Sequence, residues 1–247
     1  MQNVVNALHV LEEVAISQPV GVGELARSVG MPKSSAQRAL HTLHTAGWIR
    51  PADGGLTRWV LTAKALHVGR HATGELSLRD AAVPIMEELR RATDETIHLM
   101  VPEGGGVVLI ERLQTPKPVR IILPLGKTLP LHASANGKAV LAASPPEVIE
   151  RALGGELPGF TDTTITDPTG LRAELAVISE RGYATNGGEW RSDIAAAAAA
   201  VIGRAGTPIA SLSISTPITR MPPDKHPEYG KLVYDAAKNL GRALENL

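Results

Sequence analysis

The chain has 247 residues, 25 basic and 25 acidic side chains, 43 % apolar residues and no cysteine. This length and apolar content suit one large or two medium domains, and they exclude a disordered or collagen-like chain. The lack of cysteine excludes disulfides and thiolate chemistry, and no apolar run is long enough to span a membrane. Because the N-terminus also has no signal-peptide pattern, we expect a cytoplasmic protein with no membrane partner.

Basic residues gather near the N-terminus although the net charge of the chain is zero. Residues 25–61 contain five arginines and lysines and a single acid, Asp53. A locally basic segment on a neutral chain is typical of a small module that binds phosphates. Five basic side chains also occur on ordinary solvated surfaces, so charge alone does not decide between these interpretations.

Three helices are predicted in this basic region. Apolar residues repeat at helical spacing from Val4, which predicts a helix over about 4–17. A second, short helix stops at Gly30, and Pro32 suits the first turn of a third helix that runs to about Ala46. Two short helices around a glycine turn favour a helix-turn-helix.

The third predicted helix has the two faces that DNA recognition requires. Small residues, Ala26 and Ala36, stand where two steeply crossing helices would touch. The outer face carries side chains that donate to phosphates and base edges in a major groove. The predicted DNA-binding residues on this helix are Lys33, Ser34, Ser35, Gln37, Arg38 and His41.

After the third helix the apolar spacing changes to that of strands. Trp48 to Arg50 predicts one strand, Asp53 to Gly55 a hairpin turn, and Leu56 to Leu61 the returning strand. A helix-turn-helix followed by a hairpin is a winged helix. Arg58 would lie on the wing, where it is a candidate for a phosphate or minor-groove contact.

Helices and strands are mixed in the rest of the chain, which predicts an α+β domain. Helices are expected over 62–74, 77–93, 145–153, 168–182 and about 226–246, and the segment from His132 to Ala142 is expected to begin as a loop and become a helix. Strands are expected over 96–101, 107–113, 119–123, 194–202 and 208–215. The alanine tract within 194–202 favours a helix by propensity, yet its place before a hairpin turn favours a buried strand. We expect three parts: a winged-helix domain over 1–62, a linker helix over 63–76 and a second domain over 77–247.

The order of these features resembles the IclR family of bacterial transcriptional regulators over essentially the whole chain. The most specific segments that carry the resemblance are Leu131 to Ala142 (LHASANGKAVLA) and Leu212 to Pro217 (LSISTP); Gly30 to Ser35, Arg181 to Tyr183 and Glu189 add to it. The resemblance implies a winged helix, a linker helix and a GAF/PAS-like effector domain. It also implies ligand-controlled repression or activation at an operator in double-stranded DNA, by a homodimer or a dimer of dimers.

The resemblance also implies where a small-molecule effector would bind. The residues carried over to the effector pocket are Ala135, Asn136, Asn186, Ala196, Ser213 and Ser215. Asn186 stands where the family often has an acid, which removes a negative charge from the pocket. Because the start of the helix that contains Gly137 favours an anion, we expect a small organic acid or a hydroxylated aromatic, with Leu99, Ile121, Leu123, Leu125 and Leu131 available for apolar walls.

Two alternatives remain open at this point. The second domain could serve only to oligomerise a DNA-binding protein. A hydrolase is a remote alternative, since the chain has serines, histidines and acids but neither the G-x-S-x-G pattern nor a metal-binding histidine spacing. We therefore expect no enzyme activity, no cofactor and no metal.

Overall fold

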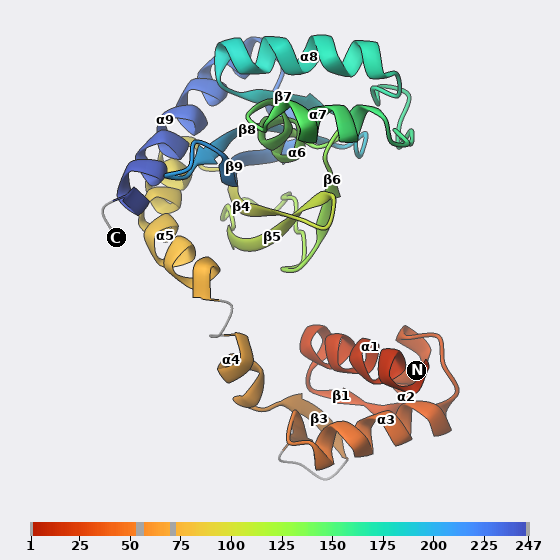
Figure 1. The fold of residues 1–247 in the computed structure, drawn as a ribbon. Helices are drawn as coiled ribbons and strands as arrows, with labels where there is room; N and C mark the ends of the chain where they lie inside the picture. The colour runs from red at the N-terminus through yellow and green to blue at the C-terminus, as the bar shows by residue number, and fades with distance from the viewer. Residues whose placement is uncertain (1, 53–56, 70–72, 246–247) are drawn as a thin grey trace. The chain divides into compact units, whose positions relative to one another are not determined.

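The computed structural model describes residues 2–52, 57–69 and 73–245. The chain divides into two compact units, Met1–Gly74 and Glu75–Leu247 (Figure 1). Each unit buries an apolar core of its own, as is expected of segments that fold as separate domains.

The first unit contains three packed helices and a small antiparallel sheet. The helices are α1 (Gln2–Ser17), α2 (Val22–Ser28) and α3 (Lys33–Thr45). The strands β1 (Val20–Gly21), β2 (Ile49–Pro51) and β3 (Arg58–Leu61) pair in the order β1-β3-β2. The predicted winged helix-turn-helix is confirmed, whereas the predicted turn at Asp53 to Gly55 lies outside the described residues.

Small residues set how closely α2 and α3 cross. Ala26 and Ala36 are both buried in the core of this unit, together with Leu25 and Leu40. Gly30 between the two helices has a φ of +68°, a left-handed conformation that side chains with a Cβ rarely adopt. The outer face of α3 is therefore held away from the core by the packing of its inner face.

The second unit is a six-stranded antiparallel sheet with helices on both faces (Figure 1). The strands are β4 (Thr96–Glu103), β5 (Gly106–Leu113), β6 (Thr128–Pro130), β7 (Ala184–Gly187), β8 (Ile194–Ile202) and β9 (Pro208–Pro217), in the order β6-β5-β4-β9-β8-β7. The helices are α5 (Thr73–Thr93), α6 (Ala135–Ala142), α7 (Pro146–Leu153), α8 (Pro168–Arg181) and α9 (His226–Glu245), with single 3-10 turns at Ile218–Arg220 and Pro223–Lys225. The predicted mixture of helices and strands is confirmed.

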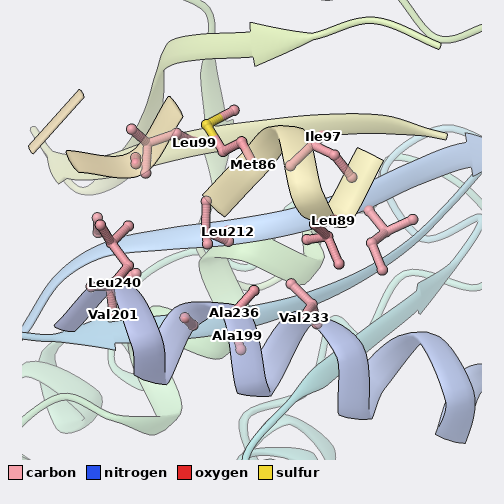
Figure 2. Packing of buried hydrophobic residues seen from close by; sticks show 14 of the residues in the cluster. Met86, Leu89, Ile97, Leu99, Ala199, Val201, Leu212, Val233, Ala236 and Leu240 are labelled. Carbon is pink, nitrogen blue, oxygen red and sulfur yellow. The ribbon is translucent and has the colours of Figure 1, made fainter. Parts of the chain in front are cut away.

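Strand β8 is the alanine tract, and its side chains are buried on both faces of the sheet. Ala195, Ala197 and Ala199 face α5 and α9, whereas Ala196 and Ala198 pack in the cluster of α6, α7 and α8. Figure 2 shows the first of these layers, with Val233 and Ala236 of α9 against the sheet. Sheet pairing overrides the helix propensity of alanine here, because β8 pairs with β9 from Ile194 to Ile202 and with β7 from Ala195 to Ala198.

The predicted strand over 119–123 is wrong. Residues 120–124 have neither helix nor strand structure, although Ile121 and Leu123 are buried and Ile122 is exposed. The apolar run that suggested a strand is only partly buried: Ile121 and Leu123 pack in the core of the unit, whereas Val119 and Ile122 are exposed. Strand β6 was missed because three residues are too few for a periodic signal, and β7 was missed for a similar reason.

Two helices occupy the region where a connecting helix was expected. Helix α4 (Lys64–Gly69) belongs to the first unit, and α5 begins at Thr73, before the predicted boundary at 76. From Leu78 onward α5 packs on the sheet through residues spaced at helical intervals, including Ala82 and Met86. None of the helices within the described ranges is long and apolar enough to cross a membrane.

Because each unit has its own core, we expect the second unit to fold without the first. A fragment of residues 73–247, which keeps α5 whole, should show a far-ultraviolet circular dichroism spectrum typical of a fold that contains both helices and strands. It should also unfold in one cooperative transition on heating. An insoluble fragment, or one with no cooperative transition, would show that the boundary is misplaced.

Candidate functional site

The outer face of α3 is free of packing and carries positive charge. Lys33, Ser34, Gln37, Arg38 and His41 are exposed, and Ser35 is half-buried. Arg38 donates a hydrogen bond to the Ser35 hydroxyl at 3.1 Å, and the helix contains no acid. The six residues predicted on this helix therefore lie together on or beside one exposed surface.

Among the described residues, no side chain caps the start of α3. Pro32 is the N-cap residue and supplies no side-chain cap. The first backbone N–H groups of a helix have no partner within the helix, and they favour an anion. A phosphate oxygen near Lys33 would meet both this helix terminus and the lysine ammonium.

Arg58 lies on the wing strand β3 but is engaged within the first unit. Its guanidinium bonds Glu24 at 2.8 Å and the backbone oxygen of Pro19 at 2.6 Å. Glu24 also accepts from the N–H of Gly21, and this bond and then Arg58 hold the pKa of Glu24 below its usual range. A role of Arg58 at DNA remains a prediction, and it requires the guanidinium to leave Glu24.

The six predicted effector residues all line one cavity in the second unit. They come from the start of α6 (Ala135, Asn136), from β7 (Asn186), from β8 (Ala196) and from β9 (Ser213, Ser215). Strand register explains the grouping, because Ala196 pairs with both Asn186 and Ser215. Residues at alternating positions of neighbouring strands share a face, and α6 lies over that face.

The cavity is small in this structure. Its volume is about 30 Å³, which is room for about two water molecules. A larger and more open groove of about 810 Å³ runs along the β4–β5 turn, α6 and α7, and its lining includes none of the six predicted residues. A ligand the size of an aromatic ring would therefore need the cavity walls to move.

Two buried polar atoms at the cavity have no hydrogen-bond partner among the described residues: His98 Nε2 and Ser213 Oγ. His98 and Ser213 are directly opposed on β4 and β9, and both are at least 98 % buried. Leaving a buried polar group without a partner costs about 1–3 kcal/mol. Such atoms are uncommon in folded proteins, and two at one cavity suggest a site for a ligand.

Burial lowers the pKa of His98 to about 4, with a smaller contribution from the nearby Arg112 guanidinium. The imidazole is therefore neutral at physiological pH. A neutral imidazole has one N–H donor and one acceptor nitrogen. Nε2 can thus donate to a ligand oxygen or accept from a ligand hydroxyl, depending on the tautomer.

The two asparagines are already bonded within the unit. Asn136 donates its amide to Ser211 Oγ at 3.0 Å. Asn186 donates to the backbone oxygen of Ala133, and its side-chain oxygen accepts from the N–H groups of Gly188 and Glu189, each at 3.1 Å. Asn186 therefore shapes the β7–β8 loop, and little of its bonding capacity remains for a ligand.

The first turn of α6 sits close against the chain that precedes it. Ser134 caps the helix by accepting from the N–H of Gly137 at 3.0 Å. A Cβ on Gly137 would lie 2.5 Å from Leu131 Cα and Pro130 O, so only glycine allows this approach. Ala135 and Asn136, whose N–H groups precede the first bonded donor of the helix, both line the cavity.

Half of the residues that line the cavity were not among the six predicted effector-binding residues. The further lining residues are His98, Leu123, Leu129, Ser134, Trp190 and Ile194. Of the five predicted apolar wall residues, only Leu123 is among them. Leu125 is 56 % exposed, and Leu99 lies on the opposite face of β4, in the core with α5 and α9. His98 could have been found from strand alternation, but Trp190 gave no signal in the sequence.

The cavity lacks the arrangement of a hydrolase. The hydroxyl of Ser213 is not bonded to His98, and no Asp or Glu is among the described residues that line the cavity. A serine nucleophile needs both a hydrogen-bonded base and a group that orients it. Within the described ranges, no cluster of three or more histidines and acids could hold a metal ion.

Comparison with known protein families gives matches over most of the chain. A family model described as IclR helix-turn-helix domain matches residues 3–53, and one described as Bacterial transcriptional regulator IclR C-terminal matches residues 70–242. The transcriptional repressor IclR of Escherichia coli is 32 % identical, with 97 % of this chain and 89 % of the repressor covered. The regulator KdgR of Escherichia coli is 30 % identical, with 99 % and 93 % covered.

Solved structures show the same fold. The IclR crystal structure from Thermotoga maritima has a TM-score of 0.81 and 27 % identity, over 99 % of both chains. An IclR homologue from Microbacterium hydrocarbonoxydans, in complex with 4-hydroxybenzoate, has a TM-score of 0.81 and 26 % identity, over 99 % of this chain and 100 % of that one. The curated relatives are named as transcriptional regulators or repressors, not as enzymes. This chain belongs to the IclR family of bacterial transcriptional regulators.

Proposed function

We propose that the protein binds operator DNA as a dimer or a dimer of dimers through the outer face of α3. We propose further that a small organic acid or hydroxylated aromatic, bound in the enclosed cavity, controls this binding. The unpartnered pair His98 and Ser213 is the observation that carries the ligand proposal. Since the partner is DNA, we infer a cytoplasmic location.

The shape and charge of α3 support the DNA proposal. A major groove about 12 Å wide admits one helix, and Arg38 lies where it can reach base edges. Lys33 lies at the helix start, where a phosphate would bind. A two-fold dimer would place two such helices in successive major grooves about 34 Å apart, on a pseudo-palindromic site.

The chemistry of the cavity supports an anionic or hydroxylated ligand. Of the described residues that line it, none is an acid, and the first N–H groups of α6 favour negative charge. His98 and Ser213 offer bonds to a carboxylate or hydroxyl on the sheet side. The relative from Microbacterium hydrocarbonoxydans was crystallised with 4-hydroxybenzoate, which carries both groups.

The small volume of the cavity supports control by the ligand. A ligand can shift an equilibrium only by binding two conformations with different affinity. A cavity of about 30 Å³ must open to admit an aromatic acid, so the liganded and unliganded walls differ. We expect the resulting coupling to DNA binding to be about 1–3 kcal/mol. A domain that only oligomerises would have no need for unpartnered polar atoms at an internal cavity.

The DNA proposal predicts that two substitutions on α3 affect DNA binding in different ways. Arg38→Ala should cost about 1–3 kcal/mol of operator binding and relax specificity at the contacted base pair. Lys33→Ala should weaken binding to all sequences alike and flatten its salt dependence. Fluorescence anisotropy with operator and scrambled DNA at several salt concentrations measures both effects, and Arg172→Ala, an exposed arginine of the second unit, is the control. Unchanged operator affinity in the Lys33→Ala, Arg38→Ala double variant would exclude this docking.

The ligand proposal predicts opposite effects of two neighbouring serines. Ser213→Ala removes an unpartnered hydroxyl, so it should raise the free energy of unfolding by about 1 kcal/mol while weakening effector binding. Ser211→Ala is the matched control: it removes the acceptor of Asn136 and should lower the free energy of unfolding by about 1 kcal/mol. Urea unfolding and calorimetry with a panel of benzoates and small carboxylic acids measure both. If Ser213→Ala destabilises the protein as Ser211→Ala does, Ser213 is not a vacant ligand contact.

The low pKa of His98 predicts a loss of stability on acidification. The imidazole pKa is about 4 in the folded protein and 6.5 in the unfolded chain, so the unfolded chain binds the proton first. The contribution is fully present above pH 6.5 and is lost as the pH falls to 4, by about 3 kcal/mol in total. The free energy of unfolding, measured with urea, should therefore fall less on acidification for His98→Asn than for the unaltered protein. If the free energies of unfolding of the two proteins fall in parallel from pH 7.5 to 4, His98 is not held neutral in the folded protein.

A further inference from the structure

Lys138 on α6 is among the largest fully buried side chains in the protein, with 1 % exposure. Its ammonium lies 2.7 and 2.8 Å from the two carboxylate oxygens of Glu189 and 3.5 Å from Oε1 of Glu174. A buried cation is tolerated only where it is paired and hydrogen-bonded. Since Glu189 lies in the loop between β7 and β8, the pair fixes that loop against α6.

The β7–β8 loop forms one wall of the cavity, and its bonds converge on Glu189. Asn186 and Trp190, on either side of Glu189, both line the cavity. The Glu189 N–H donates to Asn186 Oδ1 at 3.1 Å, and its backbone oxygen accepts from Thr164 at 2.5 Å and from Thr161 at 3.2 Å. Lys138 links this network to α6. The first turn of α6 lines the cavity beside this wall.

The pair is largely removed from water. Burial raises the pKa of Glu189, and the charge of Lys138 opposes that shift. Glu174, which lies beside Lys138, is itself 3.7 Å from Arg181. Ion pairs in such surroundings keep their hydrogen-bond geometry because either charge alone would be uncompensated.

We propose that Lys138 and Glu189 are positioning residues of the effector cavity: their ion pair holds Trp190 and Asn186 at a fixed place relative to the first turn of α6. This inference rests on the proposed effector site. The wall tied by this pair is then the fixed wall of the cavity, and opening occurs on the side of Leu123, which lies in a segment with neither helix nor strand structure. A ligand meets a preformed frame on the fixed side, so its affinity depends on the pair although neither residue lines the cavity.

The environment of Trp190 tests this directly, without a ligand. The chain has three tryptophans, and 19F spectra of protein labelled with 5-fluorotryptophan report each one separately. Trp190→Phe assigns the signal, and the change of its shift between H2O and D2O measures its exposure. We expect Lys138→Met with Glu189→Met to at least double that solvent effect for Trp190 and to leave Trp48 and Trp59 unchanged.

The double variant separates positioning from simple stabilisation. Replacing both members of a buried pair by apolar residues leaves no uncompensated charge, so it should recover the melting temperature that Lys138→Met alone loses. The control is Glu150→Met with Arg172→Met, which removes an exposed ion pair between α7 and α8; it should leave Trp190 unchanged. Should the double variant fail to fold, Glu189→Asp keeps both charges but shortens the contact, and it should still shift the Trp190 signal. An unchanged Trp190 signal in the Lys138→Met, Glu189→Met variant, or in Glu189→Asp if the double variant does not fold, overturns the proposal.

Ligand binding gives a second measurement. If 4-hydroxybenzoate shifts the Trp190 signal of the unaltered protein, its affinity should fall at least tenfold in the double variant, although the melting temperature is recovered. An affinity that recovers together with the melting temperature overturns the positioning role. If 4-hydroxybenzoate does not shift the Trp190 signal of the unaltered protein, this compound is not a ligand of the cavity. The solvent effect on Trp190 still decides the role of the ion pair.

Discussion

The close packing of helices on both faces of β8 is the constraint on which the second unit depends. Alanine at successive positions keeps the strand thin, so α9 can approach one face while α6 approaches the other. Larger side chains facing α6 would push that helix from the sheet, just as a side chain at Gly137 would push it from Leu131. Where Ala196 meets the first turn of α6, the same small side chains leave the cavity.

This packing places polar groups where water has little access. His98 and Ser213 are fixed by strand pairing and face a space of about 30 Å³, so they remain without partners among the described residues. Each group without a partner lowers the free energy of unfolding by about 1–3 kcal/mol. Proteins commonly retain such costs where binding requires them. Occupation by a ligand with matching oxygens would satisfy these groups, and opening of the walls would make the liganded conformation different from the empty one.

The sequence predicted the elements that have a long periodic pattern or that allow only certain residues at particular positions. The helix-turn-helix follows from Ala26, Gly30 and Ala36, since steep crossing and a left-handed turn leave few alternatives. The six predicted effector residues came from the family resemblance, and the strand register together with the position of α6 shows why they meet. Segment 119–123 misled because a short apolar run looks the same in the sequence whether it pairs as a strand or only packs Ile121 and Leu123 against the core. The bond from Asn186 to Ala133, the engagement of Arg58 with Glu24 and the contribution of Trp190 depend on contacts distant in sequence, which no local pattern encodes.

The claim that this cavity is the effector site is tested most directly by a crystal structure. The full chain would be crystallised with the benzoate or small carboxylic acid that raises its melting temperature most. The account predicts ligand density between His98 Nε2 and the first turn of α6, with the cavity enlarged beyond 30 Å³. Density only in the open groove of about 810 Å³ along α6 and α7, with the cavity unchanged, would contradict it.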